Sequence, residues 1–85
     1  MPKLITAAER LIRARILIQN ARDFPVPDPG GKHDFSYVAN VKDLLRQARD
    51  LVKFIPQSAG ANAEIKADAV RIFHEIEEAD REILH

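Results

Sequence analysis

The middle of the chain carries a regular apolar pattern. Between residues 35 and 55, apolar side chains recur at alternating intervals of three and four residues, which places them along one face of an α-helix. These positions are Val38, Val41, Leu45, Ala48, Val52 and Ile55, and Leu44 and Leu51 widen the face on one side. The pattern predicts a helix over about 35–55, capped by Asp34 or Ser36 and ended by Pro56. A face this wide predicts that the helix is covered by more than one neighbour.

Segments on both sides of this helix have the same spacing. Thr6 and Glu9 have the form of a capping box, which predicts a helix over about 7–23 that Phe24 and Pro25 bring to an end. Its core face comprises Leu11, Ala14, Ile18 and Ala21. A third helix is predicted over about 63–84, with Ser58 or Asn62 as its cap and a face made of Ile65, Ala69, Ile72, Ile76, Ala79 and Ile83.

Three helices of similar length, each with one apolar face, can close a single core. We therefore predict an all-α domain over residues 1–85, folded as an antiparallel three-helix up-down-up bundle. The Pro/Gly-rich segment 24–33 forms the first connection, and its ten residues exceed the two to eight that are usual between bundled helices. The alternative is a helical hairpin, with one of the three helices detached and exchanged between subunits.

Composition narrows the class of protein. The chain has no cysteine, which excludes disulfides and cysteine-based zinc sites. No apolar run approaches the roughly 20 residues of a membrane span, and charged residues follow the N-terminus too closely for a signal peptide. We therefore expect a cytoplasmic protein with no membrane partner.

The net charge of zero hides an asymmetry between the two ends of the chain. Residues 1–23 carry a net charge of +3 and residues 61–85 a net charge of −4. Because the first and third helices are neighbours in the predicted bundle, the favoured interpretation is attraction between them within one chain. The alternative is charge-matched docking to another protein.

Several residues near the C-terminus resemble parts of metal sites. His74 and Glu78 are one helical turn apart with Glu75 beside them, and Glu82 and His85 have Glu-x-x-His spacing. An imidazole and a carboxylate one turn apart face the same way and can share a metal ion. A carboxylate-bridged di-iron bundle needs this motif twice, however, and the first two predicted helices supply a single glutamate. We expect an exposed polar face here.

Two further patterns are weak matches to nucleotide sites. Glu77 with Asp80, and Glu75 with Glu78, suggest magnesium ligands, but all four lie on one predicted helix and magnesium ligands usually converge from several elements. The segment 30–33, Gly-Gly-Lys-His, precedes a helix but lacks the first glycine and the hydroxyl residue of a phosphate loop. We expect no metal, no cofactor, no identifiable small-molecule substrate and no enzymatic activity.

The first predicted helix has more apolar residues than one core face needs. Ile12 and Ile16 lie off that face, and they are covered either by Phe24 and Val26 of the linker or by contact with a second copy or another helical protein. Burial of an isoleucine is worth roughly 1.5–3 kcal/mol, which matters in a small domain. We expect a small protein–protein interaction or scaffold protein that self-associates, most simply as a homodimer. Its candidate partner-binding residues are Ile5, Ile12, Ile16, Arg13 and Arg15.

Two alternatives belong to other functional classes. A nucleic-acid-associated accessory protein would use the basic first helix, with Arg10, Arg13, Arg15 and Arg22 as phosphate-binding residues. No aromatic residues interleave with these arginines, the acidic third helix lies close by, and the short turn of a helix-turn-helix is missing. A metal-dependent enzyme built on the acidic third helix is the weaker alternative. We favour the interaction protein.

Overall fold

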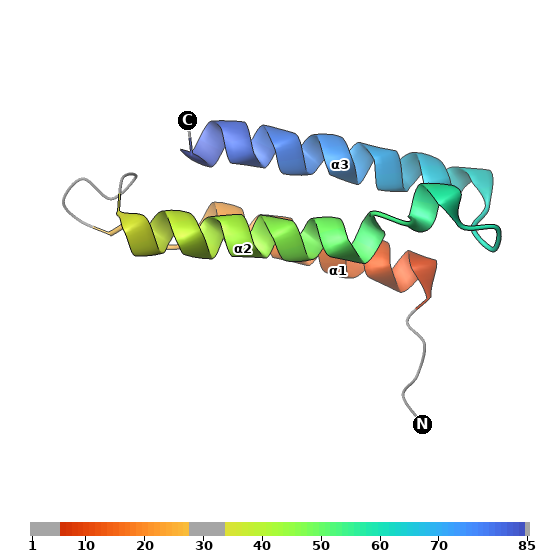
Figure 1. The fold of residues 1–85 in the computed structure, drawn as a ribbon, viewed down its shortest axis with the longest axis horizontal. Coiled ribbons are helices and arrows are strands. Elements are labelled where there is room, and N and C mark those ends of the chain that lie inside the picture. Colours follow the sequence, from red (N-terminus) through yellow and green to blue (C-terminus); the bar gives the residue numbers. More distant parts are fainter. Residues whose placement is uncertain (1–5, 28–33, 85) are drawn as a thin grey trace, which may run out of the picture.

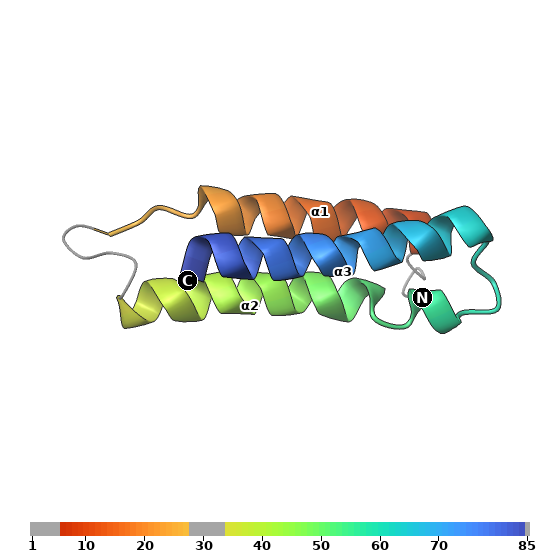
Figure 2. The same cartoon turned by 90° about the horizontal axis from the view of Figure 1, so that it is seen from above.

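The structure, a computed structural model, describes residues 6–27 and 34–84. Its helices are α1 (Ala7–Asp23), α2 (Phe35–Val52) and α3 (Ala63–Leu84), with the short 3-10 helix η2 (Ile55–Gln57) between α2 and α3. The helices run up, down and up, and α3 covers the seam between α1 and α2 (Figures 1 and 2). This confirms the predicted all-α three-helix bundle. None of the described helices combines the length and apolarity that a membrane span requires.

Side-chain caps determine where the helices begin. The Thr6 hydroxyl accepts a hydrogen bond from the Glu9 amide at 3.1 Å, as the capping box predicts. Of the alternatives left open at the next two helices, the Asp34 carboxylate caps α2 through the Tyr37 amide at 3.0 Å, and the Asn62 side chain caps α3. Each cap satisfies a backbone donor that has no partner within the first helical turn.

The end of α2 differs from the prediction. The helix was expected to reach residue 55 but ends at Val52, and the chain tightens into η2 at Ile55. Pro56 explains the difference, because proline has no amide proton and cannot donate the hydrogen bond to the Val52 carbonyl that would continue α2. Ile55 nevertheless stays buried, so η2 continues the apolar face that α2 begins.

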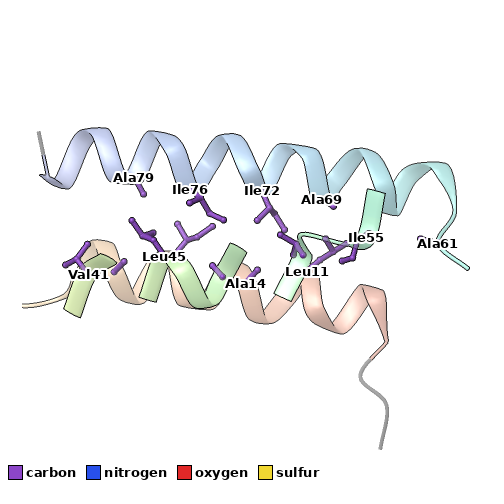
Figure 3. Packing of buried hydrophobic residues seen from close by; sticks show 14 of the residues in the cluster. Leu11, Ala14, Val41, Leu45, Ile55, Ala61, Ala69, Ile72, Ile76 and Ala79 are labelled. Carbon is purple, nitrogen blue, oxygen red and sulfur yellow. The ribbon is translucent and has the colours of Figure 1, made fainter. Parts of the chain in front are cut away.

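The core lies along the shared axis of the three helices. It contains all four predicted positions of α1, four of the six predicted for α3, and most of those predicted for the middle segment. The predicted positions that are only partly buried against it are Val38, Leu44, Leu51, Ile65 and Ile83. Figure 3 shows these side chains pointing inward from all three helices. Tyr37 is a buried member that the sequence analysis did not assign, and its ring lies 6.0 Å from that of Phe24. The buried side chains of the described residues include no charged group.

Candidate interaction surface

The outer face of α1 carries two large apolar side chains in solvent. Ile12 is 60% exposed and Ile16 is 53% exposed, and they lie one helical turn apart on the side of α1 that faces away from the core. Glu9 and Arg13 flank them, with 4.0 Å between the Glu9 carboxylate and the Arg13 guanidinium. These four residues are referred to below as the α1 outer face. Ile5, the other predicted apolar residue of this surface, lies outside the described residues.

The two apolar linker side chains that the structure describes leave this surface open. Phe24 packs against Tyr37 at the start of α2, and Val26 is itself about half exposed. Neither side chain therefore buries Ile12 or Ile16, and the sequence-based alternative in which the linker covers them is not observed in the described part of the chain. The other large exposed apolar side chains are scattered singly over α2, α3 and their flanks, which is ordinary for a protein surface: Phe35, Phe54 and Val70.

Arg15, predicted as a partner-binding residue, is engaged within the chain. Its guanidinium donates two hydrogen bonds to the Asp68 carboxylate of α3, at 2.8 and 2.7 Å, and a third to Glu75 at 3.3 Å. In the last turn of α1, Arg22 donates to Glu82 at 2.6 Å. These pairs confirm that the basic first helix and the acidic third helix attract each other within one bundle.

The ion pair between Arg15 and Asp68 shifts the pKa of both side chains. The hydrogen bonds from Arg15 hold the pKa of the Asp68 carboxyl below its usual range, with partial desolvation acting in the opposite direction. The hydrogen bonds to Asp68 likewise raise the pKa of Arg15. A carboxyl whose pKa is lower in the folded than in the unfolded chain stabilises the fold. This stabilisation is complete at pH values above the unfolded pKa of about 3.9, and it is lost as the pH falls through the pKa of the folded chain.

Replacement of Asp68 by asparagine tests this pair. We expect the free energy of unfolding at pH 7 to fall by about 0.5–1.5 kcal/mol, since the pair is bidentate but partly solvated. The difference between the variant and the wild type should be smaller at pH 3 than at pH 7, because the stabilisation by a carboxyl with a lowered folded pKa is lost progressively once the pH falls below the unfolded pKa of about 3.9. Urea denaturation at the two pH values measures both effects. Glu78→Gln, at an exposed carboxylate of the same helix, is the control and should show neither effect.

The arginines of the nucleic-acid alternative all have partners within the chain. Arg10 donates to the backbone carbonyl of Leu51 at 3.4 Å, and Arg13 lies beside Glu9. Arg15 and Arg22 bond to the acidic residues of α3. A phosphate chain approaching α1 would have to compete with these contacts and meet the negative field of α3.

The metal and nucleotide patterns gain no support from the geometry. His74 and Glu78 are exposed on the surface of α3, and within residues 6–27 and 34–84 no three His, Asp or Glu side chains are grouped as a metal site requires. The carboxylates of Glu77 and Asp80 lie on one helix, as the sequence indicated. His85 and the segment 30–33 lie outside the described residues.

A groove between α2 and α3 escaped the sequence analysis. It is open to solvent, has a volume of about 480 Å³, and is lined from α2 by Lys42, Leu45, Arg46 and Arg49 and from α3 by Ile76, Glu77, Asp80 and Arg81. The signal was present in the sequence, because Lys42, Arg46 and Arg49 follow one another at helical spacing beside the apolar face of α2. The spacing of residues in the sequence does not show which helix lies opposite these three cations.

No protein-family model, no curated protein and no solved structure matches this chain.

Proposed function

We propose that this chain is a small helical protein without catalytic activity that acts through protein–protein contact and associates with itself through the α1 outer face. The observation that supports the proposal is the exposure of Ile12 and Ile16, which are adjacent to each other and are not buried by Phe24 or Val26. A twofold contact between two α1 helices would place four isoleucine side chains in one apolar strip. Twofold dimers are the commonest form of self-association in soluble proteins.

The size of the apolar strip sets the expected strength of association. Each isoleucine is already about half covered by its own helix, so burial of the rest gains about half of the full value of roughly 1.5–3 kcal/mol. Four such side chains contribute roughly 3–6 kcal/mol, against an association cost of about 4–15 kcal/mol. Glu9 and Arg13 at the rim contribute mainly to orientation. This gain offsets only the lowest part of the association cost, so we expect a weak dimer with a Kd in the millimolar range or above, seen as partial association at high protein concentration.

Replacement of both Ile12 and Ile16 by lysine tests the proposal. Sedimentation velocity at about 0.5 mM protein should show a shift to a lighter species than the wild type, because four introduced charges would meet across the strip. Circular dichroism should show unchanged helix content, since neither side chain belongs to the core. The matched control is Phe35→Lys with Phe54→Lys, which removes two exposed apolar side chains elsewhere and should leave the sedimentation distribution unchanged.

The proposal fails if the double lysine variant sediments like the wild type at every concentration. It fails equally if the control variant shifts the distribution as strongly, because the loss would then follow from overall charge and not from the α1 outer face.

A further inference from the structure

The two walls of the α2–α3 groove carry opposite charges. The α2 wall presents Lys42, Arg46 and Arg49, whereas the α3 wall presents Glu77 and Asp80, with Arg81 at its rim. Between the walls lie Leu45 and Ile76, whose side chains point toward each other in Figure 3. The groove is therefore a strip with a basic edge, an apolar floor and a largely acidic edge.

Among the described residues, Glu77 and the cations of the α2 wall are not paired with each other across the groove. Arg46 bonds to Asp43 of its own helix at 2.6 Å. In the described part of the chain, no hydrogen bond or ion pair joins Glu77 to the three cations of α2. The basic edge and Glu77 are consequently available to groups of opposite charge on a partner.

We propose that the α2–α3 face binds the same face of a second copy of this chain, about a twofold axis that runs parallel to the helices. Such an axis exchanges the two edges, so that the partner's α2 lies over α3 and the partner's α3 lies over α2. Rotation about this axis leaves the position of each residue along the helix axes unchanged. The cations of the α2 wall lie across the same groove as Glu77 and Asp80 in one chain, so they also lie opposite the partner's acidic wall in the dimer. Each basic edge therefore meets an acidic edge, twice per dimer.

The charges also select this arrangement over the other twofold. An axis perpendicular to the helices would place α2 over the partner's α2, with Lys42, Arg46 and Arg49 facing cations. Like charges in direct opposition disfavour that contact. With the parallel axis, α2 and α3 of both copies form a four-helix arrangement in which every neighbour is antiparallel, as in up-down bundles. Because the floor residues are already buried, charge more than apolar area determines the partner.

This contact goes beyond the proposed function, since it uses a different surface and does not require the α1 outer face. It is tested in the Ile12→Lys, Ile16→Lys background, which removes the contribution of α1. In this background we expect a dimer at about 0.5 mM protein and low salt, and a weaker dimer in about 0.5 M NaCl, where exposed charges are screened.

Charge reversal on opposite edges provides the decisive experiment. One variant carries Lys42→Glu and Arg49→Glu, and the other carries Glu77→Lys; in each, like charges meet in the symmetric dimer. Each variant alone should dimerise at least about tenfold more weakly than the background. An equimolar mixture of the two variants should restore the dimer. In the mixed pair the reversed edges face each other on one side and the native edges on the other. Lys53→Glu, a reversal at an exposed residue outside both the groove and the α1 outer face, is the control and should dimerise like the background.

A monomeric background at low salt, unchanged dimerisation of the reversed variants, or a mixture that stays monomeric overturns the proposal. Failure of the α1 contact is recognised separately, because it leaves wild type and the double lysine variant with the same sedimentation.

Discussion

Replacement of Ala48 by aspartate should leave the chain unfolded at 25 °C. Ala48 has no exposed surface and lies on the face of α2 that the other two helices cover. A carboxylate at this position would be buried without a partner, which costs several kcal/mol, and its extra atoms would not fit a closely packed core. A domain of 85 residues has only about 4–13 kcal/mol of stability in total. Far-UV circular dichroism and a thermal melt measure the loss.

The control for this variant is Ala39→Asp, because Ala39 lies on the exposed side of the same helix. Its effect should stay within about 0.5 kcal/mol, as is usual for surface substitutions. If Ala48→Asp retained native helix content and a cooperative melt, the assignment of the core face of α2 would be wrong.

Helix positions and core faces could be predicted because they follow from local spacing. Leu11, Ala14, Ile18 and Ala21 were all assigned to the core, and all are buried. Tyr37 was missed although it precedes Val41 by one helical turn, so extension of the α2 face by four residues would have found it. The end of α2 was misplaced because Ile55 fits the helical spacing of the apolar face. In the structure, Ile55 reaches the core from η2, which contains Pro56, and not from a continuation of α2.

The ion pairs and the groove could not be predicted because they depend on the hand of the bundle. Helix periodicity gives the core face of α1 but not which flank of that face lies beside α3. Arg13 and Arg15 lie on opposite flanks of α1, and the structure places Arg15 beside Asp68 and Glu75 while Arg13 lies next to Glu9. With the opposite hand, a different arginine would have met α3. The same ambiguity hid which helix faces Lys42, Arg46 and Arg49.

Replacement of Ile72 by alanine is expected to destabilise the domain more than any other single truncation on α3. Ile72 is among the largest fully buried side chains and lies midway along α3 (Figure 3). Loss of a buried isoleucine costs about 2–5 kcal/mol, because it combines lost transfer energy with the cavity left behind. For a domain of this size the midpoint of thermal unfolding should fall by about 10–30 °C. Val70→Ala, on the exposed side of α3, should lose less than about 1 kcal/mol.

The dependence of the midpoint of thermal unfolding on protein concentration distinguishes α3 packed on its own chain from α3 exchanged between two copies. In the structure, α3 packs on α1 and α2 of its own chain, and Ile72 therefore fills a core made by one molecule. In the double lysine background, melted in about 0.5 M NaCl to suppress pairing through the groove, the midpoint for Ile72→Ala should be the same at 5 µM and at 200 µM. If α3 were exchanged between two copies, unfolding would be coupled to dissociation, and both midpoints would rise with concentration. A loss at Val70 equal to that at Ile72 would instead mean that α3 is rotated about its axis.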